Sequence, residues 1–292
     1  MGLIFNMFSN NEVISYEYLY LEKERLRLAY KKIGNGQKNI LLFHGYGQDC
    51  HCWGKISKNL KEEYTFYCFD LPFHGQTNDY FSENSTGISP KNKLELAFKT
   101  FLEKNNITDF SVLGFSLGAR LALFCAEISP KNIQNIFLVA PDGVKNNFWF
   151  SLATRFWFSK MLFNAFLTNQ KIFIKFSKIL SNIGLLDKSI LNFVINQTNS
   201  TEKRQKIYNT WCFFANIPSI SIKKILAKIT QTITTKKQFL SVFLAKNDIF
   251  ITEKNIKQYL QNIDFKIVTF DCNHFKLPLL LEDILASEII TN

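Results

Sequence analysis

Residues 108–128 read TDFSVLGFSLGARLALFCAEI, and this stretch indicates both a local structure and a chemistry. The apolar run that ends near Gly114 has the composition of a buried strand, and the run from Leu117 to Ile128 has that of a helix. Between them stands Gly-x-Ser-x-Gly, with Ser116 at its centre. A tight strand-to-helix turn lifts such a serine hydroxyl clear of the sheet, and its glycines avoid clashes with neighbouring chain. The stretch therefore predicts a nucleophilic serine beside a helix N-terminus.

On either side of this stretch, short apolar runs alternate with longer helical patterns. The runs predict strands over 25–33, 39–43, 64–69 and 133–140, and apolar spacing predicts a helix over 91–104. Alternation of strand, helix and strand implies right-handed crossovers. The sequence therefore predicts an α/β protein with a mainly parallel sheet.

The alternation stops after residue 144. From 145 to 235 the chain is helix-like and rich in aromatic residues, without a convincing buried strand. The pattern then resumes with predicted strands at 239–245 and 264–270 and predicted helices at 253–261 and 278–289. The sheet is thus expected to be interrupted by an insertion of about ninety residues.

Several motifs, in this order, resemble those of the α/β-hydrolase family. They are His44-Gly45 after one strand, Asp70-Leu71-Pro72-Phe73-His74-Gly75 after the next, the turn at Ser116, an aspartate after the insertion and a histidine after the last strand. The resemblance extends from about residue 25 to 290. It implies a mostly parallel eight-stranded sheet flanked by helices, with a helical cap, or lid, between strands 6 and 7. The core domain would then comprise residues 1–144 and 236–292, and the cap 145–235.

The same resemblance assigns a Ser-His-Asp triad. A serine hydroxyl needs a base to take its proton, and His274, just past the last strand, stands where the family keeps that base. Asp248, after the strand that follows the insertion, matches the family's acid position. Asp142 is the alternative acid, because some family members take it from the preceding strand. The order Ser116, Asp248, His274 is that of the family.

The resemblance also supplies two oxyanion donors, the backbone N–H groups of Tyr46 and Leu117. His44 and His74 are interpreted as structural residues of family turns. Phe73 departs from the family, which usually has glycine there, and this bears on the shape of the loop.

Arg120, four residues after the serine, partly matches a signature of enzymes resembling the menaquinone-pathway synthase of this fold. We interpret it instead as an arginine on an exposed helix face.

The spacing of the cysteines and the length of the apolar runs indicate the cellular location and the cofactors to expect. Six cysteines form no CxxC pair, which favours a reduced, cytoplasmic setting. Cys50-His51-Cys52 has a poor spacing for a metal site, so we expect no metal and no organic cofactor. The first residues lack a basic region and a long apolar core, and no run of about 18 apolar residues predicts a transmembrane helix.

Positive charge is concentrated in the predicted cap. The whole chain carries a formal charge of +11, and the segment 145–235 alone holds 13 Lys and Arg against Asp187 and Glu202. Runs such as 148–150 and 156–158 add Phe and Trp. Three interpretations stay open: a solvated lysine face over an apolar underside, transient contact with an anionic membrane or lipid aggregate, or attraction of an anionic carrier- or coenzyme-A-linked acyl substrate. Nucleic acid is not expected, because no recognition motif is present.

These features together predict a serine hydrolase that cleaves a small-molecule ester or thioester with an apolar acyl or aryl part through an acyl-enzyme. Two alternatives remain. One is a C–C bond hydrolase or lyase of the same fold, and the other is a non-catalytic binding protein. The oligomeric state is not predicted.

Overall fold

The computed structural model describes residues 15–23, 26–77, 88–142, 157–182, 188–215, 217, 224–225, 227, 240–248 and 251–289. The predicted cap boundaries near 144 and 236 and the aromatic run 148–150 lie outside the described residues, as do the side chains of the run 156–158.

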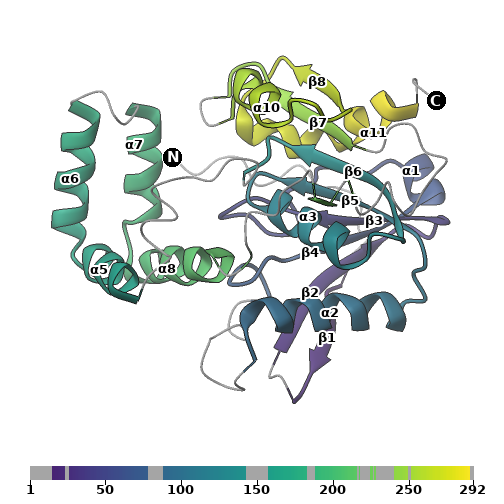
Figure 1. Cartoon of the computed structure of the whole chain (residues 1–292), viewed down its shortest axis with the longest axis horizontal. Helices are drawn as coiled ribbons and strands as arrows, with labels where there is room; N and C mark the ends of the chain where they lie inside the picture. The colour runs from purple at the N-terminus through teal and green to yellow at the C-terminus, as the bar shows by residue number, and fades with distance from the viewer. Residues whose placement is uncertain are drawn as a thin grey trace.

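Eight strands form one sheet in the order β1-β2-β4-β3-β5-β6-β7-β8. β1 and β2 pair antiparallel, β2 also pairs antiparallel with β4, and every other neighbouring pair is parallel (Figure 1). The strands are β1 (Glu17–Leu21), β2 (Leu26–Ile33), β3 (Lys38–Phe43), β4 (Tyr64–Phe69), β5 (Phe110–Phe115), β6 (Ile133–Val139), β7 (Leu240–Ala245) and β8 (Lys266–Phe270). The predicted eight-stranded, mostly parallel sheet is confirmed.

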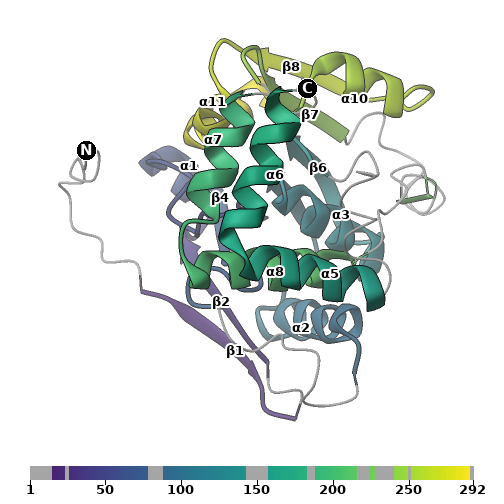
Figure 2. The ribbon, with the colours of Figure 1, turned by 90° about the vertical axis from the view of Figure 1, so that its left-hand side faces the viewer.

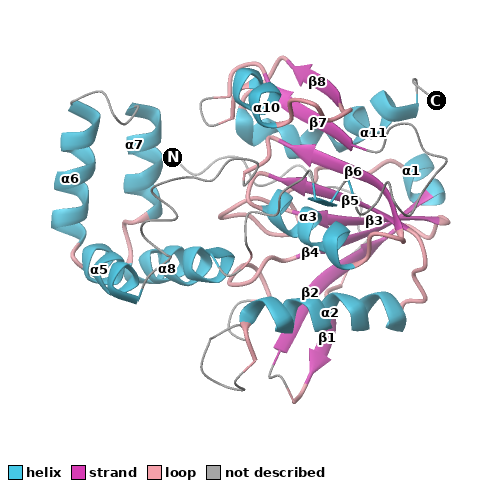
Figure 3. Ribbon diagram, in the orientation of Figure 1, coloured by secondary structure: helices cyan, strands magenta, loops and turns pink. Residues whose placement is uncertain are grey.

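Helices cover both faces of this sheet (Figure 3). The described part of the chain contains, in order, α1 (Lys58–Glu63), α2 (Pro90–Lys104), α3 (Gly118–Ile128), α5 (Trp157–Thr168), α6 (Gln170–Asn182), α7 (Lys188–Gln197), α8 (Thr201–Ala215), α10 (Glu253–Tyr259), the 3-10 helix η1 (His274–Leu280) and α11 (Leu281–Ile289). The helices from α5 to α8 lie to one side of the sheet (Figure 3). α2, α3 and α10 contribute to the hydrophobic cluster on one face. α1, η1 and α11 contribute to the cluster on the other face.

β1 is absent from the predicted strands, although the resemblance implied eight in total. Its sequence, EYLYL, buries only Leu19, and it lies at the edge of the sheet. A strand with one buried side chain carries little of the apolar signal by which buried strands are recognised. The final helix was also placed too early, because Pro278 lies in η1 and α11 begins at Leu281.

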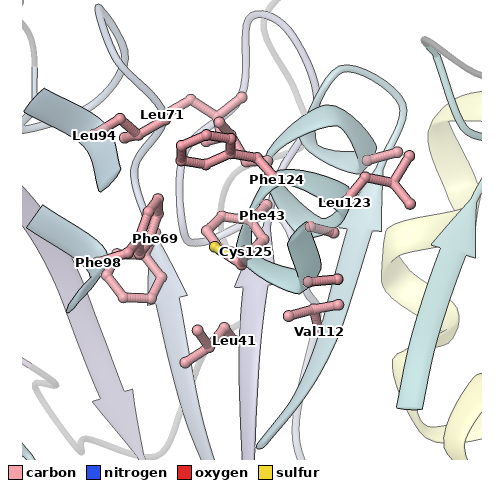
Figure 4. Close-up of a cluster of buried hydrophobic side chains, with 14 of the residues drawn as sticks. Leu41, Phe43, Phe69, Leu71, Leu94, Phe98, Val112, Leu123, Phe124 and Cys125 are labelled. Atoms are coloured by element: carbon pink, nitrogen blue, oxygen red, sulfur yellow. The ribbon is translucent and has the colours of Figure 1, made fainter. Parts of the chain in front are cut away.

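An aromatic cluster holds the carboxyl end of β3 in place. Phe43 stacks on Phe69 of β4, with ring centroids 5.5 Å apart, and Phe98 of α2 meets both rings edge-on at 5.5 and 5.4 Å (Figure 4). Such aromatic pairs add about 0.5–1.5 kcal/mol each beyond the burial of their area. This packing fixes the position at which the chain leaves the sheet for His44 and Gly45.

Two glycines let α3 pass close to the sheet. A Cβ atom on Gly118 would overlap the backbone oxygens of Phe43 and His44, and one on Gly114 would lie 2.5 Å from the Ala119 Cα. The turn after β5 therefore needs residues without a side chain on both sides of Ser116. This is the physical meaning of the glycines in the motif.

We expect Gly118→Ala to destabilise the protein by about 3 kcal/mol or more, because the new methyl group meets backbone rather than a movable side chain. In an unobstructed helix the same change would stabilise. The control is Gly47→Ala, where φ is +78° and the new methyl group would lie no closer than 3.9 Å to its nearest neighbour, the Gln197 side chain. It should cost about 1 kcal/mol from the backbone conformation alone. Urea unfolding measures both, and an equal or smaller cost for Gly118→Ala would contradict this account.

Candidate active site

The candidate site lies at the carboxyl ends of the parallel strands. Ser116 directly follows β5, His44 follows β3, and Asp70 follows β4. Asp248 and His274 follow β7 and β8 after short loops. Parallel strands bring their carboxyl ends to one edge of a sheet, which is where ligands bind in open α/β folds.

Ser116 is held in a strained turn. Its φ is +49°, a conformation that non-glycine residues rarely adopt. Its N–H donates to the Val139 carbonyl at 2.9 Å, and its carbonyl accepts from the N–H groups of Ala119 and Asp142, both at 3.0 Å. The backbone of the serine is thus bonded to α3 and to the end of β6, while the residue itself is partly exposed.

His274 and Asp248 form a buried pair. The imidazole Nδ1 lies 2.7 Å from the Asp248 Oδ2, and the two side chains are 7% and 1% exposed. The other carboxylate oxygen accepts the N–H of Ile251 at 2.9 Å. A carboxylate at Nδ1 holds the proton on that nitrogen and leaves Nε2 available as an acceptor.

The His274 ring also lies against the residue before the serine. Its centroid is 4.9 Å from that of Phe115, the last residue of β5. The fold therefore brings the imidazole to the end of the strand from which Ser116 emerges, although 158 positions separate the two residues in the sequence.

Asp142, the alternative acid, has a different partner. Its carboxylate accepts from the Arg120 guanidinium, at 3.2 Å from Nε and 3.5 Å from Nη2. Arg120 is 6% exposed, so its interpretation as an exposed helix residue is wrong. The helical pattern did not reveal this, because the burial of Arg120 depends on the loop after β6 lying beside α3.

The two expected oxyanion donors lie on one hydrophobic cluster. Leu117 is buried in that cluster, and Tyr46 packs against it from the loop after β3. The Tyr46 ring also meets the His74 ring edge-on at 5.3 Å. Where the N–H groups of Tyr46 and Leu117 point stays a prediction.

His44 and His74 tie together the two loops after β3 and β4. His44 Nε2 accepts the N–H of Leu71 at 3.0 Å, and His74 Nε2 accepts the N–H of Gly47 at 3.1 Å. Burial lowers the pKa of His44 to about 4 and that of His74 well below its usual value. Both rings are therefore neutral loop-forming groups, as their interpretation as structural residues expects.

Phe73 occupies a left-handed conformation, with φ at +64°. This explains why the family usually has glycine at this position. Phe73 is buried, and its ring meets Phe213 of α8 at 5.8 Å. A non-glycine residue in this conformation costs about 1 kcal/mol, and the packing of Phe73 against the insertion offsets that cost.

Lys206, on α8, is a residue that the sequence analysis did not single out. It is partly buried, which lowers its pKa, while the charges of Asp49 and Asp70 act in the opposite direction. Its charge also acts on His44 and His74, so it lies close to the loops at the candidate site. A lysine in a run of many others carries no sequence signal for this placement.

Cys50 and His51 of the Cys50-His51-Cys52 motif contact different groups. Cys50 Sγ lies 3.2 Å from the Tyr16 hydroxyl, and His51 contacts Asp49 and Lys31 on the surface. Among the residues that the structure describes, no group of three or more His, Cys, Asp or Glu is arranged to hold a metal ion. No helix in these ranges is both long and apolar enough to cross a bilayer.

A hollow of about 510 Å³ lies at the opposite edge of the sheet. It is lined by residues at the amino ends of strands, among them Asn39, Tyr64, Ser111 and Gln134. None of the candidate catalytic residues borders it, so we do not assign it to the reaction.

Loss of Asp142 should destabilise the protein more than loss of Arg120. Asp142→Ala leaves a buried guanidinium without this carboxylate and should cost about 2–3 kcal/mol. Arg120→Met removes the buried charge, leaves a carboxylate that is 39% exposed, and should cost less than about 1.5 kcal/mol. Urea unfolding of both single variants and the double variant measures the difference. A larger cost for Arg120→Met would contradict this reading.

The stability of the fold should fall as the pH is lowered through the range in which a free histidine titrates. Because the pKa of folded His44 lies near 4, the unfolded chain binds its proton first. This group should remove about 2 kcal/mol from the free energy of unfolding between about pH 7 and pH 5. His44→Asn should flatten that slope in part, because His74, whose pKa burial also lowers, contributes in the same direction. If the free energy of unfolding changes with pH equally in His44→Asn and in the unmodified protein, the lowered pKa of His44 is wrong.

Comparison with known proteins identifies the family of the fold. Residues 38–275 match the family model for the alpha/beta hydrolase fold. Over 125 residues the chain is 31% identical to the pimeloyl-[acyl-carrier protein] methyl ester esterase of Pseudoalteromonas atlantica, a match that covers 42% of this chain and 45% of that protein. It is 24% identical to "Putative esterase/lipase 2" of Mycoplasma genitalium over 80% of both proteins.

Solved structures share the architecture at low identity. An alpha/beta hydrolase, MGS-M2, from a Medee basin deep-sea metagenome library has a TM-score of 0.62 at 16% identity, with 92% of this chain and 97% of that chain covered. A hydrolase from Pseudomonas aeruginosa PA01 has a TM-score of 0.61 at 15% identity, covering 96% and 99%. The matches to the first curated relatives span 32–45% of those proteins' length. With the family model matched over most of its length, the chain belongs to the α/β-hydrolase fold family.

Proposed function

We propose that this protein is a serine hydrolase that cleaves a carboxylic ester or thioester with an apolar acyl or aryl part. The observation that carries the proposal is the buried 2.7 Å contact between His274 and Asp248, on an imidazole that lies against the residue preceding a strained serine. A carboxylate–imidazole pair close to a partly exposed serine is the arrangement that general-base catalysis requires.

In the proposed reaction, Ser116 Oγ attacks the substrate carbonyl while His274 Nε2 takes the hydroxyl proton. Asp248 stabilises the resulting imidazolium. The N–H groups of Tyr46 and Leu117 bind the oxyanion, and each donor of this kind contributes about 3 kcal/mol to the transition state. His274 then protonates the leaving alcohol or thiol. Water, activated by the same imidazole, hydrolyses the acyl-enzyme and restores the serine.

The preference for an apolar acyl part rests on what surrounds the serine. Leu117, Phe73 and Phe213 belong to one hydrophobic cluster, which joins the turn at Ser116 to α8. We propose that α8 and its neighbours act as the cap of the site, with the predicted domain division at residues 145 and 235. The esterase names of the relatives agree with this substrate class.

An anionic group elsewhere on the substrate would suit the charge of the insertion. Lys206 supplies a partly buried cation close to the loops after β3 and β4. A carrier- or coenzyme-A-linked acyl thioester has such a group. Contact of the basic insertion with anionic lipid is part of the same proposal. The cytoplasmic location rests on cysteine usage and stays a prediction.

The alternative of C–C bond cleavage uses the same triad, and within it Arg120 pointed to an enzyme like the menaquinone-pathway synthase. Because Arg120 is buried and pairs with Asp142, its presence is explained without a substrate. No separate observation favours that chemistry. The non-catalytic alternative is separated from the proposal by labelling of the serine.

We expect Ser116→Ala to lower kcat by about 10³-fold or more and to abolish labelling by a fluorophosphonate probe. Asp248→Asn should also lose about 10³-fold or more, because the imidazole loses its orienting carboxylate. Nitrophenyl esters of increasing acyl length and the matching acyl thioesters provide the kinetic measurement.

The matched control is Asp142→Asn, which alters the alternative acid and should keep activity within about tenfold. If Asp142→Asn inactivates and Asp248→Asn does not, the acid is Asp142. If the folded, unmodified protein is not labelled at Ser116, the catalytic proposal is wrong.

A further inference from the structure

α6 presents one exposed face that combines lysines with isoleucines. Lys171, Ile172, Lys175, Lys178 and Ile179 are all exposed. At 100° per residue they fall within about 120° of the helix circumference, with the lysines toward one side and the isoleucines toward the other. Ser177, on the opposite side, is buried. We call these five residues the α6 face.

The isoleucines of the α6 face are unusual surface residues. Ile172 is 53% exposed and Ile179 48%, and Met161 on the preceding helix is 47% exposed. They are among the few large apolar side chains that are exposed in the described part of the chain. Two isoleucines one heptad apart on the same exposed face form an apolar edge rather than an isolated side chain.

Among the described residues, the lysines of the α6 face have no acidic partner. From residue 143 to 186 the sequence contains no Asp or Glu. Within the described ranges no carboxylate lies within ion-pair distance of Lys171, Lys175 or Lys178. No carboxylate of the described ranges neutralises their charge, which suits an anionic partner.

The position of α6 leaves this face accessible. α6 packs against α5 and α7. In Figure 1 it is the helix farthest from the sheet, and Figure 2, viewed from that side, shows α6 and α7 in front of the rest of the molecule. An outward helix with a basic side and an adjoining apolar edge fits the interface of a bilayer, where lysines meet headgroups and isoleucines enter the acyl boundary.

We propose that the α6 face docks the protein on anionic phospholipid bilayers. This inference rests on the lipid contact proposed for the insertion and does not depend on the chemistry of Ser116. An anionic bilayer satisfies both halves of the face, because phosphate and carboxylate headgroups pair with the lysines while hydrocarbon accepts the isoleucines. RNA or another polyanion would satisfy the lysines alone.

The test is co-sedimentation of the full chain with vesicles of phosphatidylcholine alone or with about one third phosphatidylglycerol. We expect binding to the anionic vesicles at low salt, weaker binding at about 0.5 M salt, and no binding to the neutral vesicles. Lys171→Gln/Lys175→Gln/Lys178→Gln should weaken binding on the order of a hundredfold, since each lysine near the surface contributes several-fold. Ile172→Ser/Ile179→Ser should remove the binding that persists at high salt.

The matched control is Lys104→Gln/Lys131→Gln/Lys254→Gln, which removes the same charge from exposed positions of the core. It should bind as the unmodified protein does, and thermal unfolding checks that all variants fold. Equal losses for the two triple variants would overturn the proposal, as would absence of binding to anionic vesicles. Displacement by RNA at equal phosphate concentration, with Ile172→Ser/Ile179→Ser binding unchanged, would also overturn it, because the face would then be a general polyanion site. This experiment measures vesicle binding and not hydrolysis. A negative result would therefore overturn the docking proposal and leave the catalytic proposal untouched.

Discussion

The close passage of α3 over β3 and β5 is the constraint on which the rest of the site depends. Gly114 and Gly118 permit it, because a side chain at either position would meet backbone atoms. The passage forces Ser116 into a left-handed conformation and turns its backbone toward the ends of β6 and α3. A strained residue persists only where its surroundings over-determine it, and here three backbone hydrogen bonds do so.

Two aspartates near this turn have separate partners. Asp248 is almost fully buried and holds His274, whereas Asp142 is partly exposed and pairs with the buried Arg120. The second pair connects α3 to the loop whose N–H bonds the Ser116 carbonyl. One pair thus orients an imidazole, and the other braces the turn that carries the serine. In both cases burial makes loss of one partner costly.

The insertion differs in physical character from the core that carries it. Toward the sheet, α8 contributes Phe213 and Phe214 to the same hydrophobic cluster as Leu117 and Phe73. Away from the sheet, α6 exposes lysines that pair with no carboxylate of the described residues. The apolar contact on one side is the basis of the proposed cap, and the exposed lysines on the other are the basis of the proposed contact with an anionic surface.

The amino-acid sequence by itself determined the parallel sheet, the serine turn and the order of the candidate triad. Buried strands read as continuous apolar runs, and the turn needs glycines at fixed spacing, so both leave local signals. The edge strand β1, the burial of Arg120 and the placement of Lys206 and of the α6 face leave none. Each depends on which element lies beside it: β1 on pairing with β2, Arg120 on the loop after β6, and α6 on standing outside the rest of the molecule. The choice between Asp142 and Asp248 as the neighbour of His274 is of the same kind, because segments distant in sequence come together only when the sheet has formed. The tertiary structure places Asp248 beside His274.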